Sequence, residues 1–114
     1  MNLTNEQKET LKQCRDTYGD VAQILVSIEE LNELACVLAK YPRYEKPEEA
    51  VEDLWEKALD EVADVSIILD HVTNIFGFSD TDVSCRVEKK IHRISRWLDT
   101  NDKFSQTLVD RVVE

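Results

Sequence analysis

Two stretches decide the fold, SIEELNELACVLAK at residues 27–40 and ALDEVADVSIILDHV at residues 58–72. Each contains one acidic pair at helical spacing, namely Glu30 with Glu33 and Glu61 with Asp64. Residues three apart on a helix point to one face, with Cβ atoms about 5–6 Å apart. Each stretch therefore predicts a long helix that presents two carboxylates side by side.

The acidic pairs lie among positions that a helix normally buries. Val26 and Val37 share a face with the first pair, and the opposite face carries the apolar residues Ile24, Ile28, Leu31, Ala35 and Leu38. Glu61 falls within a seam that is otherwise apolar, formed by Leu54, Ala58, Val65, Ile68 and Val72. A bare carboxylate in such a seam is costly, so we expect a cation or a basic side chain to compensate it.

A solvated acidic face is the alternative explanation, because a single Glu-x-x-Glu in an acidic protein usually marks such a face. Two pairs, both on core stripes of long helices, favour the buried interpretation.

Length and composition predict one helical domain. The chain has 114 residues, 42% of them hydrophobic, with only 2 Gly and 2 Pro and no strand signals. We expect an all-α antiparallel bundle of four to five helices. Its expected parts are an N-terminal helix within residues 1–18, a core bundle at 20–98 and a short C-terminal helix within 99–114.

Local signals set the expected helix ends. Thr4 and Gln7 have the form of a capping box before a helix at 5–17. Asp20 is the expected N-cap of a second helix that ends near residue 40. Pro47 is expected in the first turn of a third helix, which ends at residue 76 and is followed by Gly77. Ser79 or Asp80 is the expected cap of a fourth helix that ends near residue 98.

Charge and hydropathy limit the partners. The net charge of −10 argues against long nucleic acid, because neutralising phosphates needs a basic surface. No apolar run approaches the roughly 20 residues that span a bilayer, and the amino terminus MNLTNEQKET has no apolar signal region. We therefore expect a cytoplasmic protein that does not enter a membrane.

The cysteines and histidines suggest no zinc or di-iron site. Cys14, Cys36 and Cys85 are scattered and are interpreted as small core residues. His71 and His92 lie away from both acidic pairs in helical angle and are interpreted as surface or boundary residues, so a Glu-x-x-His di-iron motif is not present.

The predicted fourth helix combines an apolar stripe with a basic strip. The stripe is Val83, Val87, Ile91, Ile94 and Leu98, and the strip beside it is Arg86, Lys90, Arg93 and Trp97. Residues 86–96 carry five basic and one acidic residue, a charge of +4. This strip either pairs with the acidic helices or forms an edge that faces phosphate.

Four carboxylates on two facing helices would form an oxygen-rich cage of the kind that hard cations prefer, Mg²⁺ above all, with Mn²⁺ as the alternative. Such a cage beside a cationic strip suggests hydrolysis at phosphorus. The metal would neutralise a polyphosphate, a carboxylate or metal-bound hydroxide would activate water, and basic side chains would hold the leaving group.

The order of these motifs resembles the MazG-like members of the all-α nucleoside triphosphate pyrophosphohydrolase superfamily. The resemblance covers residues 18–98 and consists of Gln23, Glu29-Glu30-x-x-Glu33-Leu34, a proline-bearing connection, Glu61-x-x-Asp64 and a basic helix. It implies a Mg²⁺-dependent enzyme that hydrolyses a (deoxy)nucleoside triphosphate to the monophosphate and pyrophosphate. It also implies a homodimer or homotetramer.

The resemblance also implies residue roles. Glu30, Glu33, Glu61 and Asp64 match the metal ligands, with Glu30 and Glu33 as catalytic residues and Glu33 orienting the attacking water. Lys90 and Arg93 match basic residues near the polyphosphate. From residue type alone, the side chains that could stack on or hydrogen-bond the base are Gln23, Trp55, Asn74, Tyr41, Tyr44 and Trp97, although an aromatic at helical spacing is more often a core residue.

Two other functions stay open. One is a non-catalytic acidic helical module that binds a basic protein surface, which predicts acids that face solvent. The other is a nucleotide sensor that binds the metal and the nucleotide without turnover.

Overall fold

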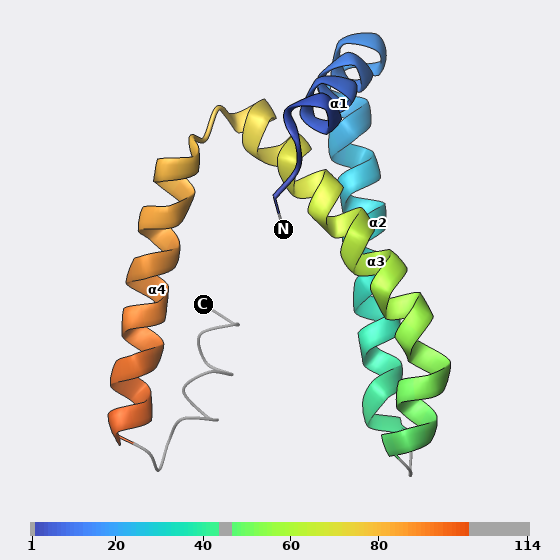
Figure 1. Ribbon diagram of the computed structural model, residues 1–114, viewed down its shortest axis with the longest axis vertical. Helices are drawn as coiled ribbons and strands as arrows, with labels where there is room; N and C mark the ends of the chain where they lie inside the picture. Colours follow the sequence, from blue (N-terminus) through green and yellow to red (C-terminus); the bar gives the residue numbers. More distant parts are fainter. Residues whose placement is uncertain (1, 44–46, 101–114) are drawn as a thin grey trace. The chain divides into compact units, whose positions relative to one another are not determined.

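The computed structural model describes residues 2–43 and 47–100, and all of the regular structure in them is helical. The elements are α1 (Asn5–Tyr18), α2 (Asp20–Lys40), the short 3-10 turn η1 (Tyr41–Arg43), α3 (Pro47–Phe76) and α4 (Asp80–Thr100) (Figure 1). The prediction of an all-α chain is confirmed for these residues. The predicted C-terminal helix falls almost wholly on residues 101–114, and Tyr44 on 44–46, which lie outside the described residues.

Most of the predicted helix ends are confirmed. The Thr4 side chain accepts from the Gln7 amide at 3.1 Å and the Thr4 amide donates to Gln7 Oε1 at 2.8 Å, which completes the capping box. Pro47 begins α3, and Gly77 follows it with a φ of +73°, a conformation that glycine adopts at little cost.

The expected cap of α2 is wrong. Gly19, with a φ of +88°, ends α1 and is also the N-cap of α2, so Asp20 is the first helical residue rather than the cap. The single residue Gly19 separates two helices because its backbone can turn where a side chain would be strained. Asp20 still lies in the first turn of α2, where a negative charge stabilises the helix dipole.

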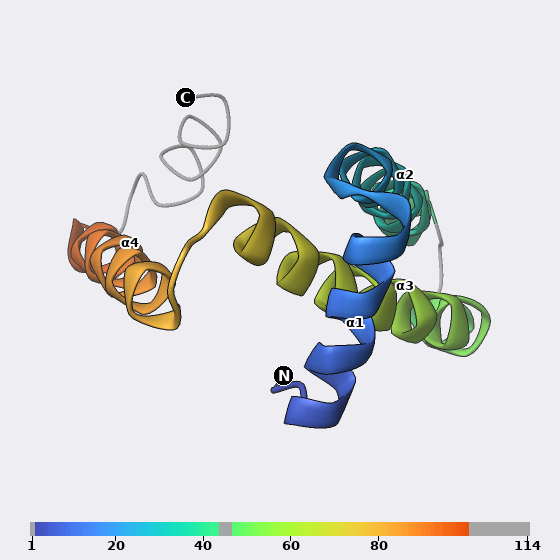
Figure 2. The same ribbon diagram turned by 90° about the horizontal axis from the view of Figure 1, so that it is seen from above.

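The chain divides into two compact units, Met1–Gly77 and Phe78–Glu114. In the first unit α2 and α3 run antiparallel and make the most extensive contact, and α1 packs on both (Figures 1 and 2). The predicted core bundle of residues 20–98 includes helices of both units, so its arrangement stays a prediction.

The contact between α2 and α3 follows one seam on each helix. The more buried positions of both helices recur at steps of four and three residues. On α2 they are Gln23, Ser27, Glu30, Leu34 and Val37, and on α3 they are Leu54, Ala58, Glu61, Val65 and Ile68. Steps of four and three keep side chains on one face of a helix, as in coiled coils. The predicted place of Glu61 within the seam of α3 is confirmed.

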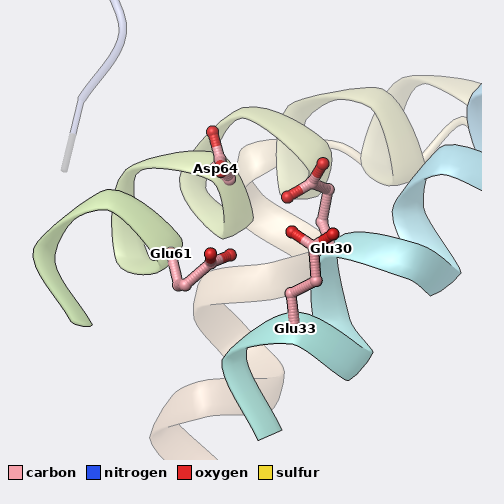
Figure 3. A group of neighbouring side chains, drawn as sticks. All are labelled: Glu30, Glu33, Glu61 and Asp64. Atoms are coloured by element: carbon pink, nitrogen blue, oxygen red, sulfur yellow. The ribbon is translucent and has the colours of Figure 1, made fainter. Parts of the chain in front are cut away.

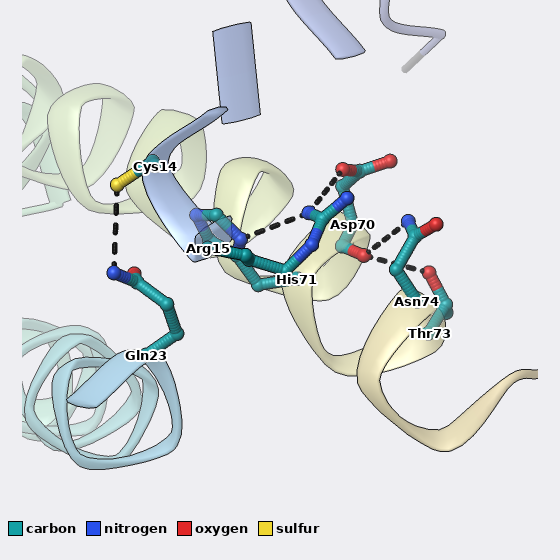
Figure 4. A network of polar contacts seen from close by, with 7 residues as sticks. All are labelled: Cys14, Arg15, Gln23, Asp70, His71, Thr73 and Asn74. Atoms are coloured by element: carbon teal, nitrogen blue, oxygen red, sulfur yellow. Dashed lines mark hydrogen bonds and ion pairs between the residues drawn. The ribbon is translucent and has the colours of Figure 1, made fainter. Parts of the chain in front are cut away.

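A buried polar contact holds α1 against α3 (Figure 4). Arg15 Nη1 lies 3.3 Å from Asp70 Oδ2 and 3.0 Å from His71 Nδ1. Because a guanidinium only donates, His71 Nδ1 must accept, which requires a neutral ring. His71 is only 3% exposed, so the prediction of a surface or boundary position is wrong for it.

Several apolar residues predicted to be buried are exposed. On the outer side of α2 these include Ile28, Leu31 and Leu38, and on α4 they include Val83, Val87, Ile91 and Leu98. No second described helix accompanies α4 within its unit, so nothing described there covers its apolar stripe. Cys36 and Cys85 are also exposed, which corrects their predicted place in the core, and Cys14 is half-buried.

None of the described helices combines the length and the apolar character that crossing a membrane requires.

Candidate metal centre

Glu30 and Glu33 on α2 and Glu61 and Asp64 on α3 turn their carboxylates toward one another across the seam (Figure 3). We call these four residues the acid cluster. One carboxylate oxygen from each residue lies within 4.8 Å of the corresponding oxygens of the other three. The structure therefore brings together all four carboxylates that the sequence singled out.

The helical spacing explains why the cluster forms. Glu30 and Glu61 occupy seam positions on their helices, so the antiparallel contact points each toward the other helix. Glu33 and Asp64 follow three residues later and stand at the same edge of their seams. Because both helices repeat the same offset, the four side chains meet in one place.

Two oxygens of the cluster are buried without a partner. Within the described part of the chain, Glu30 Oε2 and Glu61 Oε2 are the buried side-chain polar atoms that have no hydrogen-bond partner. Glu33 is the exposed member of the cluster, while Asp64 is half-buried. Buried carboxylate oxygens without donors are unfavourable, so a ligand that supplies positive charge would remove the penalty.

Burial and mutual repulsion raise the pKa of two members. Burial, followed by the charges of Asp64 and Glu33, raises the pKa of Glu30 to about 7. A hydrogen bond with the Asp64 carboxyl and the charge of Glu61 add to the increase. Such a bond needs a proton on one of the two carboxyls, so it is lost when both are ionised and leaves them without a donor.

The same causes act on Glu61. Burial raises its pKa, and the charges of Glu33, Asp64 and Asp60 and a hydrogen bond with Glu33 raise it further. Among the described residues, every charge that perturbs either glutamate is negative, so no described basic side chain supplies the compensation expected from the sequence. A cation remains as the candidate.

The spacing of the oxygens fits a hard divalent cation. Two ligands on opposite sides of Ca²⁺ stand about 4.6–5.2 Å apart, and on opposite sides of Mg²⁺ about 4.0–4.2 Å apart. The four oxygens of the cluster lie within 4.8 Å of one another, which is close enough for one such cation to contact all of them. The residues present therefore fit a hard divalent cation.

The other predicted site residues do not belong to the cluster. Gln23 is buried, and its Nε2 lies 3.4 Å from Cys14 Sγ, so it joins α2 to α1 (Figure 4). Trp55 is exposed on α3. Lys90 and Arg93 are exposed on α4, in the second unit. Asn74 is exposed, and its side chain donates to the Asp70 carbonyl oxygen of its own helix at 2.8 Å.

Sequence reasoning missed the contact of Arg15 with Asp70 and His71. A signal was present, because His71 follows Ile68 by three residues and Asp64 by seven and therefore lies on the edge of the α3 seam that carries Asp64. The sequence contained no comparable signal for Arg15, whose partners lie 55 and 56 residues away.

Comparison of the chain with family models, with curated proteins and with solved structures gives no match.

Proposed function

We propose that this protein is a MazG-like hydrolase that cleaves a (deoxy)nucleoside triphosphate to the monophosphate and pyrophosphate with Mg²⁺, or Mn²⁺ in its place. Water attacks either the α- or the β-phosphorus. The bond that breaks is the one between the attacked phosphorus and the oxygen that bridges the α- and β-phosphates, and that oxygen leaves with the other phosphorus. The observation that carries the proposal is the acid cluster, with four converging carboxylates and two buried oxygens that lack a donor.

The four members of the cluster have different roles in this proposal. Glu30 and Glu61, whose unpartnered oxygens are buried, would hold the cation together with Asp64. Bound Mg²⁺ would neutralise the polyphosphate and act as a Lewis acid on a phosphoryl oxygen. Glu33, the exposed member, can be reached by a water molecule, and we assign to it the orientation of that water and acceptance of its proton.

The charge of the cluster supports a substrate that binds together with a cation. Four ionised carboxylates would repel a bare polyphosphate, whereas a polyphosphate that carries divalent cations matches the cluster. Lys90 and Arg93, the residues predicted to contact the polyphosphate, are exposed in the basic segment of α4 within the second unit, so their role stays a prediction.

The alternative of an acidic protein-binding module is less well supported. That function would be served by carboxylates that face solvent and stand apart, since each would contact a separate basic side chain. Here three of the four are at least half-buried and two have buried oxygens without donors. A nucleotide sensor would use the same cluster and differs only in the absence of turnover.

Hydrolysis of a panel of common NTPs and dNTPs, with release of pyrophosphate as the readout, tests the proposal. We expect activity that requires Mg²⁺ and that falls at least a hundredfold in Glu30→Gln and in Asp64→Asn, with helicity by circular dichroism unchanged. Glu29→Gln is the matched control, because Glu29 is exposed, adjacent in sequence and outside the cluster.

Two results would contradict the proposal. If neither Mg²⁺ nor Mn²⁺ supports hydrolysis or raises the melting temperature, the acid cluster is not the metal centre of this hydrolase. If Mg²⁺ and nucleotide stabilise the fold but no pyrophosphate appears, the nucleotide sensor is the correct function.

A further inference from the structure

α1 is attached to the rest of its unit by few side chains. None of its residues is buried, and the half-buried ones are Leu11, Cys14 and Arg15. Two of these three make polar contacts, since Cys14 Sγ lies 3.4 Å from Gln23 Nε2 on α2 and Arg15 contacts α3 (Figure 4). The seam between α2 and α3 is far more extensive. The docking of α1 therefore depends strongly on the contact that Arg15 makes.

A single residue joins α1 to α2. Gly19 has a φ of +88°, and beyond its chain neighbours no heavy atom lies within 4 Å of the position that a Cβ would take there. A change in the backbone dihedral angles of Gly19 would move α1 as a rigid unit and leave the hydrogen bonds within both helices intact. Gly19 is therefore suited to act as a hinge for α1.

The contact that holds α1 requires a neutral His71. Arg15 Nη1 lies 3.0 Å from His71 Nδ1, and a guanidinium can only donate, so Nδ1 has to present a lone pair. His71 is 3% exposed and the Arg15 side chain 11% exposed. Protonation of the ring would therefore remove the acceptor and place two positive charges side by side where little water can screen them.

The surroundings of the ring oppose its protonation while α1 is docked. Among the described residues, the charges that act on His71 are those of Arg15 on α1 and Asp70 on its own helix, and no charge on α2 is among them. Burial and the charge of Arg15 lower the pKa of His71, and Asp70 offsets them only in part. A ring exposed to solvent would bind a proton near the ordinary pKa of 6.5. Proton binding therefore favours the undocked helix.

We propose that α1 is a pH-sensitive switch, which stays docked on α3 while His71 is neutral and turns away about Gly19 when His71 is protonated. The seam between α2 and α3 stays closed in both states. Acidification strengthens this seam, because Glu30, with a pKa of about 7, loses its charge over the same pH range and repels its neighbours less. Release of α1 would uncover Gln23 and His71, which are buried in the docked form.

Hydrogen–deuterium exchange in EDTA, at about pH 7.5 and about pH 5.5 and corrected for intrinsic rates, tests the switch. In the wild type we expect the protection of residues 5–18 to fall about three- to tenfold at the lower pH. The limit is about tenfold for each unit of pH below 6.5, since one proton is bound on opening. The protection of residues 23–37 and 54–68 should not fall.

Matched variants identify the group that titrates. His71→Asn carries an amide oxygen that can accept from Arg15 and takes up no proton, so residues 5–18 should be equally protected at both pH values. His92→Asn replaces an exposed histidine in the second unit and should keep the wild-type response. Arg15→Met lacks the donor, so residues 5–18 should be poorly protected at both pH values.

Three results would overturn the switch. The first is equal protection of residues 5–18 at both pH values in the wild type. The second is a loss on acidification in His71→Asn as large as in the wild type, which would assign the response to another group. The third is a parallel loss in residues 23–37 and 54–68, which would mean that the whole unit unfolds.

NMR titration of the wild type decides the question without a variant, including the case in which His71→Asn fails to dock α1. The imidazole protons of His71 and the amide signals of α1 should shift with one midpoint, because one proton controls both. Separate midpoints would overturn the proposal. Neither measurement uses Mg²⁺ or a nucleotide, so the outcome is independent of the metal centre and of the proposed hydrolysis.

Discussion

Glu30 on α2 and Glu61 on α3 each direct one buried carboxylate oxygen, Oε2, into the seam between the helices, and neither oxygen has a hydrogen-bond donor among the described residues. Two like charges in a helical seam oppose the contact that the surrounding apolar side chains favour. Without a cation, these carboxylates destabilise the contact between α2 and α3. A bound cation would remove that repulsion.

Glu61→Gln should stabilise the protein in EDTA and remove its response to Mg²⁺. The amide carries no charge and can donate to a neighbouring carboxylate, so repulsion within the cluster falls. We expect a melting temperature a few degrees above that of the wild type in EDTA, and no further increase with Mg²⁺. Thermal melts followed by circular dichroism measure both.

Glu56→Gln is the control for this change, because Glu56 is an exposed glutamate on the same helix and outside the cluster. It should melt like the wild type in both buffers. Destabilisation by Glu61→Gln in EDTA would contradict the account of repulsion.

The pH dependence of stability should carry the signature of Glu30. Its pKa is about 7 in the folded protein against an ordinary value of 4.5, so between these values the folded state binds more protons than the unfolded state. The free energy of unfolding in EDTA should therefore fall as the pH rises from about 4.5 to about 7. Glu30→Gln should lack this component, and the difference between the two curves isolates it.

Mg²⁺ should reverse this trend, because a bound cation favours the ionised cluster. The stabilisation by Mg²⁺ should be small at low pH and grow as the pH rises through about 7, with release of protons on binding. Calorimetric titration in buffers of different ionisation enthalpy measures the protons. A response to Mg²⁺ that is independent of pH would contradict the raised pKa of Glu30.

Arg15→Met should destabilise the contact between α1 and α3. The Arg15 and Asp70 side chains are each only 11% exposed, so removing the guanidinium leaves a largely buried carboxylate and the His71 Nδ1 atom without their donor. We expect a loss of about 2–4 kcal/mol in the free energy of unfolding, measured in urea.

Lys12→Met tests whether burial is the cause. Lys12 lies on the same helix and pairs with Asp16 at 3.2 Å, but these side chains are 59% and 64% exposed. We expect a change below about 0.5 kcal/mol. An equal loss in the two variants would mean that burial of the Arg15 pair does not matter.

Arg15→Met should also change the pKa of His71. Burial, together with the positive charge of Arg15, lowers the pKa of this ring, and the charge of Asp70 opposes them. Arg15→Met should therefore raise the pKa of His71, which NMR of the imidazole protons can follow. Because the folded state disfavours the protonated ring, His71 should make the wild type less stable as the pH falls below its ordinary value of 6.5.

Ser79→Ala should weaken the start of α4. Ser79 Oγ accepts from the Asp82 amide at 3.0 Å, and the Ser79 amide donates to Asp82 Oδ2 at 2.9 Å. These bonds lower the pKa of Asp82, so Ser79→Ala should raise that pKa toward its ordinary value. Loss of the cap should also lower the free energy of unfolding by about 1 kcal/mol. NMR titration of the Asp82 carboxyl measures the shift, and Ser84→Ala, an exposed change within the same helix, should leave it unaltered.

The sequence was sufficient for the features that depend on spacing within one helix. The extents of the four helices follow from Gly19, from the two prolines and from Gly77, and the acid cluster follows from two repeated offsets in antiparallel helices. It was not sufficient for contacts between distant residues. Arg15 reaches Asp70 because the turn at Gly19 lays α1 across α3, and no local pattern encodes that direction.

Burial was predicted least well on the outer side of the helices. Leu31 and Leu38 have the spacing of core residues and are nevertheless exposed, because helical spacing shows which side chains share a face but not whether another element covers that face. His71 was misjudged for the converse reason, since a polar side chain on a seam is buried when a donor such as Arg15 satisfies it.

The exposed Cys36 and Cys85 affect how this protein must be handled. Neither thiol is paired, and both are accessible from solvent, so air oxidation can link two chains covalently. Such cross-linked species would have twice the mass of one chain and would resist dilution. Preparations kept under a phosphine reductant, or carrying serine at both positions, would report only the association that side-chain packing produces.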